Sequence, residues 1–390
     1  MPLSDQTILC LATQGWDAHW TPVQQVMLRL APANRVLYFE PFRPMLRRLI
    51  KGNVESSAHQ SQLREVRPNL FIYRPGYPYL PFHLRSRWAA AANAPLYKRE
   101  IAALLGRFGA KSPWLWAFFA QSPTVLDLSF QHIIYDCLDD WPAFFPNPRE
   151  KRFVAEVDET LCRRANLVFV GSEPLRQKKS QWNPATFVVN HAADVEHFMR
   201  ATHPDTQIPA DLESIPHPRI GFVGMADTVR FDTDLVRRIC ERPEYHVVIV
   251  GGLLGGVDRQ LPSLPNLHVL GMKAIADLPG YLKGMDVLLM PYRINEATRN
   301  IYPLKLHEYM ATGKPVLATA IPAVEDFRDL IYVANDYEQF LQKIGTALTE
   351  TDLALSAWRL ERARQHDWQS HLNQKINIIE THLLATTTAL

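Results

Sequence analysis

The residues with the clearest chemical pattern in this sequence lie within 298–319, TRNIYPLKLHEYMATGKPVLAT. Pro303 predicts the start of a helix over 303–312, because the first helical turn has no partner for the N–H that proline lacks. Gly313 fits the left-handed cap that ends a helix, and a strand should follow it. The loop before Pro303 would then present backbone N–H groups at a helix N-terminus, an arrangement that attracts phosphate.

Lys305 and Glu308 lie three positions apart in this predicted helix, so their side chains share one face near its start. A cation beside a diphosphate and a carboxylate that binds sugar hydroxyls would together hold a nucleotide sugar. The alternative is an exposed Lys–Glu pair on an amphipathic helix.

Glycines follow three of the predicted strands and would let the backbone approach a ligand closely. Gly221 and Gly224 flank the end of the first C-terminal strand, and four further glycines follow the second, within 251–256. Gly15 follows the first strand of the chain, so its loop should lie beside the donor phosphates or sugar. The alternative is that these glycines serve only as turn residues.

Asp139 and Asp140 follow the predicted strand 132–136 and should lie at its carboxyl end. One of them could position or deprotonate an acceptor hydroxyl. The alternative is that they cap the next helix or pair with Arg149 or Arg152.

Short apolar runs alternate with longer helical patterns along most of the chain. They are near-continuous rather than alternating, which favours parallel sheets covered on both faces. The predicted strands cover residues 7–12, 35–40, 132–136, 167–171, 186–190, 219–224, 245–252, 286–291 and 315–319. The predicted helices include 22–30, 232–241, 275–283 and 303–312. The fold class is therefore α/β, with two Rossmann-like, doubly wound domains.

A proline-rich segment, 203–218, is the best candidate for a linker. We therefore predict an N-terminal acceptor-binding domain over 1–200 and a nucleotide-sugar domain over 201–365. A C-terminal helix within 366–390 is expected to pack back on the N-terminal domain. Ligands bind at the carboxyl ends of parallel strands, so the two domains should face one another across a cleft.

The 390 residues have a formal net charge of +2, but the charge is unevenly distributed. Residues 1–200 are basic, with 24 Lys and Arg against 17 Asp and Glu, and the remainder is acidic, with 18 against 23. Most of the excess lies within 29–111, where basic residues are interleaved with apolar and aromatic ones. Its basic residues include Arg43, Arg47, Arg48, Lys51, Arg85, Arg87, Lys98 and Arg99, and Trp88 and Tyr97 are among its aromatic residues. This pattern suits an anionic membrane surface or an anionic acceptor. The alternative is a solvated helix face whose arginine side chains cover the core. Nucleic-acid binding is disfavoured, because no nucleic-acid motif accompanies the patch.

Several other classes of protein lose their sequence support. The sequence contains no GxGxxG, GxxxxGK[ST] or GxSxG motif. Its four cysteines are far apart, which disfavours a zinc site or a disulfide framework and fits a reducing cytoplasm. Asp139 and Asp140 are adjacent and badly spaced for Mg²⁺, so we expect neither a metal nor another cofactor. We also expect no signal peptide and no membrane span.

The stretch PLKLHEYMATGKPVLAT closely resembles the donor-site helix and strand of GT-B glycosyltransferases of retaining glycosyltransferase family four. The resemblance continues through IIYDCLDDWPAFF, LCRRANLVFVGSEPL and VVNHAADVEHF, and through the first strand and helix of the chain. It is greatest to the branch that acts in teichuronic-acid and exopolysaccharide assembly. Residues 43–115 do not share it.

This resemblance implies roles for individual residues. Glu308 matches the second glutamate of the family's E-x7-E motif, which holds the nucleotide ribose, whereas Asn300 stands where the first glutamate would contact the donor hexose. Gly224 and Arg230 match the glycine and lysine of a G-R-x4-K pattern, and Met225 replaces its arginine. The missing positive charge could come from Arg299 or Arg293.

The resemblance implies a retaining hexosyltransferase that moves a sugar from a nucleoside diphosphate sugar, most often a UDP-sugar, to an acceptor hydroxyl. The expected acceptor is a lipid-linked saccharide of cell-surface polysaccharide synthesis. The expected location is the cytoplasm, peripheral on the inner face of the membrane. Two alternatives remain open: a sugar-nucleotide epimerase, and a non-catalytic nucleotide-sugar-binding subunit.

Overall fold

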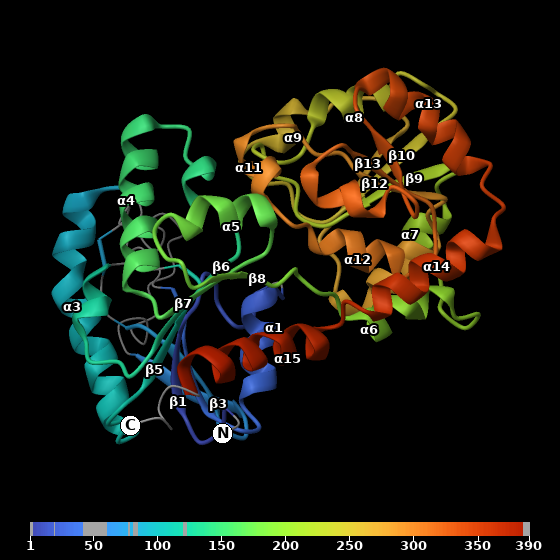
Figure 1. Ribbon diagram of the computed structural model, residues 1–390. Helices are drawn as coiled ribbons and strands as arrows, with labels where there is room; N and C mark the ends of the chain where they lie inside the picture. The colour runs from blue at the N-terminus through green and yellow to red at the C-terminus, as the bar shows by residue number, and fades with distance from the viewer. Residues whose placement is uncertain are drawn as a thin grey trace. The chain divides into compact units, whose positions relative to one another are not determined.

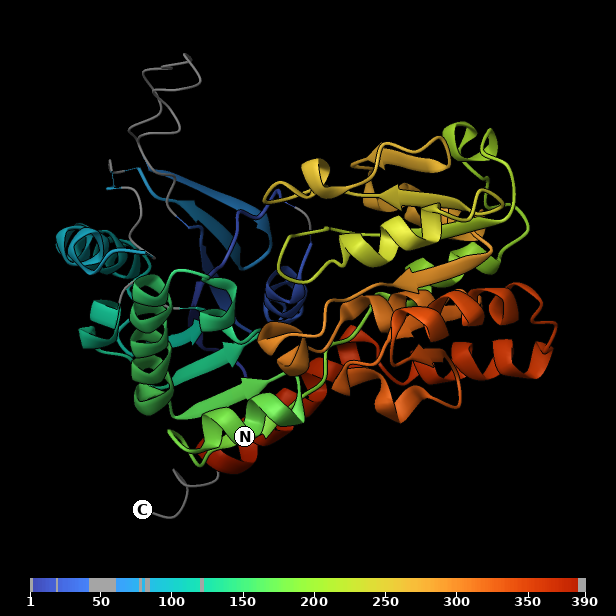
Figure 2. The same ribbon diagram turned by 90° about the horizontal axis from the view of Figure 1, so that it is seen from above.

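The computed structural model describes residues 3–18, 20–41, 61–76, 79–80, 85–119 and 123–384 (Figures 1 and 2). The chain folds into two compact units, one formed by 1–190 with 371–390 and the other by 191–370. The sequence placed the corresponding divisions after residues 200 and 365. The basic residues Arg43, Arg47, Arg48 and Lys51 lie outside the described residues.

The described part of the first unit contains an eight-stranded sheet in the order β3-β4-β2-β1-β5-β6-β7-β8. All neighbouring strands in it are parallel except β3 and β4. The strands are β1 (Thr7–Leu11), β2 (Arg35–Phe39), β3 (Gln62–Arg67), β4 (Leu70–Arg74), β5 (Trp114–Ala117), β6 (Ile133–Cys137), β7 (Leu167–Val170) and β8 (Thr186–Val188). The helices are α1 (Pro22–Leu30), α3 (Arg87–Arg107), η2 (Pro123–Asp127), η3 (Trp141–Phe144), α4 (Pro148–Arg164) and α5 (Glu173–Ser180), with α15 (Trp368–Ile379) and η7 (Glu380–Leu384) at the C-terminal end.

Helices cover both faces of this sheet, as the apolar runs predict (Figure 1). The apolar sides of α1 and α15 pack on one face, and those of α3 and α4 pack on the other. A buried ion pair also holds α15, since Lys375 Nζ contacts the Asp136 carboxylate of β6. The C-terminal helix therefore belongs to the hydrophobic core of the first unit.

The second unit contains a six-stranded parallel sheet in the order β11-β10-β9-β12-β13-β14. The strands are β9 (Arg219–Val223), β10 (His246–Val250), β11 (Leu267–Gly271), β12 (Val287–Met290), β13 (Val316–Thr319) and β14 (Tyr332–Ala334). The helices are α6 (Val195–Met199), η4 (Arg200–Thr202), α7 (Ala210–Glu213), α8 (Thr233–Cys240), α9 (Val257–Gln260), η5 (Ile275–Asp277), α10 (Leu278–Lys283), α11 (Glu296–Asn300), α12 (Leu304–Met310), η6 (Pro322–Phe327), α13 (Tyr337–Leu348) and α14 (Leu353–Arg364). The apolar sides of α10 and α12 pack on one face of this sheet, and those of α8 and α13 pack on the other.

The predicted α/β class is confirmed: each unit has a sheet that is parallel, apart from the β3–β4 pair of the first unit, and is covered by helices on both faces. Each predicted strand is present. Five further strands escape a search for long apolar runs: β3 is largely exposed, β11 is at an edge, and β4, β5 and β14 have three to five residues.

The proline-rich segment 203–218 is not a free linker, because it packs against α10 within the second unit. Lys283 Nζ donates to the carbonyl oxygens of His203, Pro204 and Thr206, each at 2.8 Å. Proline restricts the backbone φ angle, so a connection rich in proline can be rigid.

Within the described residues, no helix combines the length and the apolar character needed to cross a membrane.

Candidate functional site

The second sheet reverses its winding direction between β9 and β12. The chain leaves β9 toward β10 on one side, and it leaves β12 toward β13 on the other. In doubly wound sheets, ligands bind beside the carboxyl ends of the strands at such a point. The loops after β9 and β12, together with α12, therefore border the candidate site.

Gly224 follows β9 and lies against the side chain of Lys305. Its φ of +142° is one that residues with a Cβ rarely adopt. A Cβ built at Gly224 would overlap the Cε and Nζ atoms of Lys305. The Lys305 ammonium also lies 5.2 Å from the centroid of the Phe222 ring. The first loop and the predicted diphosphate-binding lysine thus meet at the end of β9.

Tyr309 fixes α12 in this position. Its buried hydroxyl accepts a hydrogen bond from Val223 N at 2.8 Å and donates one to Val223 O at 3.1 Å. Tyr309 and Lys305 are four residues apart, so they lie on the same side of α12. The bond between α12 and the last residue of β9 therefore positions the lysine one helical turn away.

Arg230 lies in the same loop and is oriented by Asp227. The guanidinium Nε donates to Asp227 Oδ2 at 2.7 Å, while Oδ1 accepts from the backbone N–H groups of Val229 and Arg230 at 3.0 and 2.9 Å. The carboxylate thus holds both the turn and the cation, which remains one-third exposed. This half-buried arginine can reach an incoming anion.

The charges of Lys305, Glu308 and Arg230 influence one another. Burial lowers the pKa of Lys305; the charge of Glu308 opposes this shift, and that of Arg230 adds to it. Burial raises the pKa of Glu308, and Lys305 opposes that shift. Both groups are half-buried and close enough to interact electrostatically. An anionic ligand would offset the cost of keeping Lys305 charged in this environment.

The segment after β12 lies beside the Arg230 loop. Arg293 N donates to Arg230 O at 2.8 Å, and the Asn295 amide donates to Val229 O at 2.6 Å. The Arg293 guanidinium donates to Phe231 O at 3.0 Å and to Thr233 Oγ1 at 2.9 Å. Arg293 therefore supports the loop, which leaves Arg299 as the other candidate for the missing charge.

Arg299 and Asn300 end the short helix α11. Arg299 is exposed, and the Asn300 amide donates to Glu296 O at 3.2 Å within the helix. The amide of Asn300 is thus oriented by its own helix.

The predicted helix over 303–312 is shorter than expected. α12 has seven residues, Leu304–Met310, and Pro303 is its N-cap rather than part of its first turn. Gly313 has a φ of +70°, as the predicted left-handed cap requires. A helix this short contributes little dipole, so the case for phosphate binding depends on the side chains of Lys305 and Arg230.

In the first unit, the loop that contains Gly15 is held by Glu40. A Cβ at Gly15 would lie 3.4 Å from Glu40 Oε1, and the same oxygen accepts a hydrogen bond from Trp16 N at 2.9 Å. Glu40 is buried at the end of β2. The loops that follow β1 and β2 therefore contact one another through Gly15, Trp16 and Glu40.

Asp139 and Asp140 both follow β6, but their environments differ. Asp140 is fully buried and forms an ion pair with Lys178 at 2.7 Å. Its side chain makes no capping hydrogen bond to η3, and the ion pair is with Lys178 rather than with the expected Arg149 or Arg152. A buried, paired carboxylate does not reach a substrate in this conformation, which corrects the expectation for Asp140. Asp139 is half-buried, and its role toward an acceptor stays a prediction.

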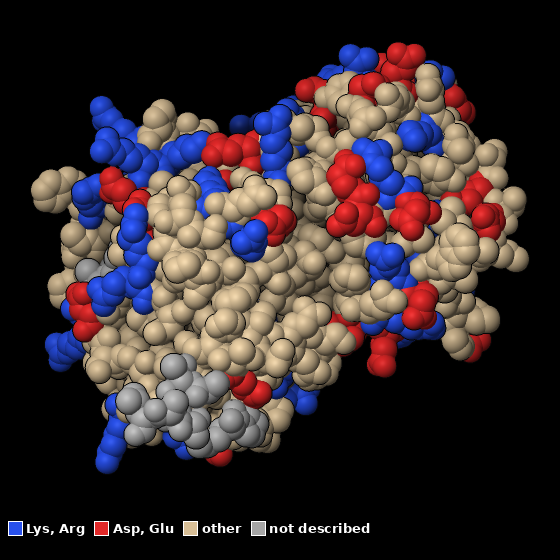
Figure 3. All heavy atoms as spheres, viewed as in Figure 1, with Lys and Arg blue, Asp and Glu red and all other residues tan. Residues whose placement is uncertain are grey.

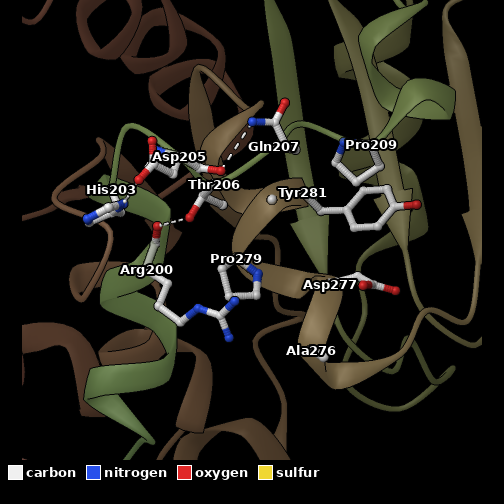
Figure 4. Close-up of a pocket in the computed structure, with 11 residues that line it drawn as sticks. Arg200, His203, Asp205, Thr206, Gln207, Pro209, Ala276, Asp277, Pro279 and Tyr281 are labelled. Carbon is white, nitrogen blue, oxygen red and sulfur yellow. Dashed lines mark hydrogen bonds and ion pairs between the residues drawn. The ribbon is translucent and has the colours of Figure 1, made fainter.

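A surface depression elsewhere in the second unit is lined by none of the predicted site residues. It lies between residues 200–209 and the start of α10 (Figure 4). Thr206 Oγ1 donates to Arg200 O, and the Gln207 amide donates to Asp205 O. Two of its polar side chains thus bond within the lining itself, and none of the predicted donor residues lies there.

The sequence did not single out the residues that position the site: Tyr309, Asp227, Asn295 and Glu40. Tyr309 had one available signal, its spacing of four from Lys305. Asp227 bonds within its own loop, which has no recognisable motif. Asn295 and Glu40 bond to loops that are distant in sequence.

Comparisons with known proteins identify the kind of domain to which the second unit belongs. Residues 217–350 match the family model described as glycosyl transferases group 1. The chain is 25% identical over 281 residues to TuaH of Bacillus subtilis (strain 168), which bears the name of a teichuronic acid biosynthesis glycosyltransferase; the match covers 67% of this chain and 70% of that protein.

Solved structures show the fold across nearly the whole chain. Sucrose-phosphate synthase from Thermosynechococcus elongatus superposes with a TM-score of 0.69 at 16% identity, over 97% of this chain and all of the other. Anabaena HepE in complex with UDP and glucose gives 0.64 at 13% identity, over 99% of this chain and all of the other. Together these findings support glycosyltransferase activity. Residues 217–350 form a glycosyl transferase group 1 domain, in a chain that has the GT-B fold.

Proposed function

We propose that this protein transfers a hexose from a nucleoside diphosphate sugar, most simply a UDP-sugar, to an acceptor hydroxyl with retention of anomeric configuration. The observation that carries the proposal is the packing of Lys305 against Gly224, beside Arg230, at the end of β9. The HepE structure, which holds UDP and glucose, has the same fold and supports the choice of donor.

In this proposal, Lys305 and Arg230 bind the diphosphate, with Arg299 as an additional cation. The bond between the sugar C1 atom and the diphosphate oxygen breaks, and the electron pair moves to the diphosphate. These cations stabilise that growing negative charge, so no metal ion is required in the proposed reaction. Removing one such charge should cost about 2.7–4 kcal/mol of transition-state stabilisation.

Glu308 is proposed to accept hydrogen bonds from the ribose hydroxyls, since it lies one turn after Lys305 on the same helix. Asn300 is proposed to contact the donor hexose through its amide. An amide can donate as well as accept, whereas a carboxylate only accepts, so this position should favour different hydroxyl orientations.

The acceptor oxygen forms the new bond to C1 on the face that the diphosphate leaves. Its proton passes to the departing diphosphate oxygen, and no protein nucleophile is assigned. Asp139 is proposed to orient the acceptor hydroxyl.

We propose a lipid-linked saccharide as the acceptor, with the protein peripheral on an anionic membrane in cell-surface polysaccharide synthesis. The outer side of α3 supports this assignment: Trp88 is 87% exposed, and the helix carries Arg87, Lys98 and Arg99 while its acidic residue, Glu100, is buried. Figure 3 shows Lys and Arg side chains projecting from the α3 and α4 side of the first unit. The TuaH relative bears the name of a polysaccharide-biosynthesis enzyme.

Liposome sedimentation tests the membrane assignment. Trp88→Ala with Arg99→Glu should abolish association with vesicles that contain anionic lipid. The exposed Trp358→Ala in the second unit serves as the control. Unchanged association of the α3 variant would refute the proposed surface.

Turnover of radiolabelled UDP-sugars, with and without a lipid-linked saccharide, tests the reaction itself. Transfer to the acceptor supports the proposal. Conversion of the donor to its epimer without an acceptor would identify an epimerase, and binding without turnover would identify a non-catalytic subunit. Asn300 and Met225, which replace the usual family residues, keep the last alternative open.

A further inference from the structure

The first sheet has its own reversal point, between β1 and β5. The chain leaves β1 toward β2 on one side and leaves β5 toward β6 on the other. The loop after β1 therefore borders the crevice in which sheets of this type bind small molecules. Gly15 of this loop is expected to lie beside the donor phosphates or sugar, but the side chains around it have no assigned ligand.

Buried groups hold this loop in one conformation. Glu40, 2% exposed, accepts from Trp16 N at 2.9 Å, and the Tyr38 hydroxyl donates to Gln14 O at 2.9 Å. A turn closes between Gly15 O and Ala18 N at 3.1 Å. A binding site benefits from such support, because less conformational freedom is lost when the ligand binds.

Polar side chains of opposite charge project from the supported loop and from the neighbouring strands. Asp17 is 60% exposed and binds Arg64 Nη2 through both carboxylate oxygens, at 2.7 and 2.5 Å. Arg74 Nη2 lies 3.7 Å from Asp17, and Arg74 Nε donates to Glu40 at 2.8 Å. The four groups balance one another in charge, so this cluster attracts neither anions nor cations strongly.

An aromatic surface lies within the same loop. Trp20 is 39% exposed, and its ring centroid lies 5.7 Å from that of Trp16. Trp16 is itself fixed edge-on against Tyr38 at 5.2 Å. A partly exposed indole on a fixed base offers a flat apolar face at low entropic cost.

We infer that the β1 loop is the acceptor subsite and that it recognises an uncharged pyranose residue. The apolar face of the sugar ring would stack on Trp20, and its hydroxyls would donate to Asp17 and accept from Arg64. Because Arg64 is already paired with Asp17 and Arg74 with Glu40, a sugar carrying a carboxylate would gain no net attraction from the cluster and would be repelled by Asp17. This inference rests on the proposed transferase function and names the chemical class of its acceptor.

Binding of methyl glycosides to the full chain, measured by ligand-observed NMR, tests the inference without requiring turnover. The probes are methyl glucoside, galactoside, mannoside and N-acetylglucosaminide, compared with methyl glucuronide. At least one neutral glycoside should bind more tightly than the glucuronide. Trp20→Ala and Asp17→Asn should each weaken that binding about ten- to a hundredfold, the range expected when a stacked ring or a hydrogen bond to a charged group is lost.

Asp17→Asn provides a second readout that loss of folding could not produce. Removing the carboxylate leaves Arg64 without its partner, so the preference should shift toward the glucuronide. Asp127→Asn is the matched control, because Asp127 is similarly exposed and pairs with Lys98 in the same unit. Trp358→Ala, which removes an exposed indole of the second unit, is the aromatic control. Neither control should alter glycoside binding.

Tighter binding of the glucuronide to the wild type would overturn the inference. So would the absence of glycoside binding, or variants that bind neutral glycosides as the wild type does. UDP stabilisation of the same proteins is measured in parallel: if UDP stabilises them while glycoside binding fails, only the acceptor inference is wrong. If UDP has no effect, the proposed donor function fails independently.

Discussion

Replacing Gly224 with alanine tests how closely the end of β9 and Lys305 depend on one another. The added Cβ would occupy the space of Lys305 Cε and Nζ, so the lysine side chain must move. The backbone is strained as well, because the φ of +142° is one that alanine rarely adopts.

These two effects have different expected sizes. Backbone strain of this kind costs about 1–3 kcal/mol of folding stability. Displacing Lys305 from the diphosphate should also remove about 2.7–4 kcal/mol of transition-state stabilisation, which is roughly a hundred- to a thousandfold in kcat/KM.

A double-mutant cycle separates the two effects. Gly224→Ala and Lys305→Ala are made singly and together, and the stability, the UDP affinity and the kcat/KM of each are measured. Once Lys305 has been truncated, the new Cβ has less to displace, so the effects on UDP affinity should be strongly non-additive. Gly109→Ala is the control for strain, because Gly109 has a φ of +60° with no atom near the added Cβ.

Additive losses of UDP affinity in the double mutant would refute this reasoning. They would mean that Gly224 and Lys305 act on the ligand independently. Unchanged affinity in Gly224→Ala would likewise exclude the proposed position of Lys305.

Three further predictions concern anchoring, burial and pH. Tyr309→Phe should lower the free energy of unfolding by about 1–3 kcal/mol and weaken UDP binding, because the backbone groups at the end of β9 lose a buried partner. An unchanged free energy of unfolding and an unchanged UDP affinity would contradict this anchoring role. Lys375→Met should lower the free energy of unfolding, measured with denaturant, by about 3–5 kcal/mol, because Asp136 loses its ion-pair partner. Adding Asp136→Leu should recover part of this loss. If it recovers none, the ion pair is not the cause of the destabilisation. UDP affinity should be greatest below the lowered pKa of Lys305 and should fall as the pH rises through it, because only the ammonium form binds the diphosphate. Calorimetry at a series of pH values should show that Lys305→Arg removes this pH dependence. If the dependence persists in Lys305→Arg, Lys305 is not its source.

The sequence predicted the parallel sheets well because buried parallel strands are continuously apolar. RIGFVG and DVLLMP are examples, and both are strands in the structure. β3 escaped prediction because its sequence, QLREVR, is mostly exposed and gains its stability by pairing with β4. The limit of α12 at Met310 could not be predicted either, since Ala311 and Thr312 are compatible with another half turn.

The candidate donor residues could be predicted because each has a local pattern. The spacing of Lys305 and Glu308 indicates a shared helix face, and Gly224 and Arg230 follow an apolar strand. Asp140 shows where such patterns fail. Its position after β6 suggests an exposed carboxylate, but the side chain is buried and forms an ion pair with Lys178, which is distant in sequence. Pairing across a fold depends on topology, which spacing along the chain does not reveal.

The central claim is that Lys305 and Glu308 hold the nucleotide part of the donor, and thermal stabilisation by UDP, GDP, ADP and CDP tests it most directly. At about 100 times its dissociation constant, a ligand adds roughly 2.7 kcal/mol to folded-state stability. Lys343 is the control position, a half-buried lysine on α13, which packs on the opposite face of the second sheet. We predict stabilisation by UDP that Lys305→Ala and Glu308→Ala reduce and Lys343→Ala leaves unchanged. Equal stabilisation of all four proteins, or none by any nucleotide, would contradict the proposed donor site.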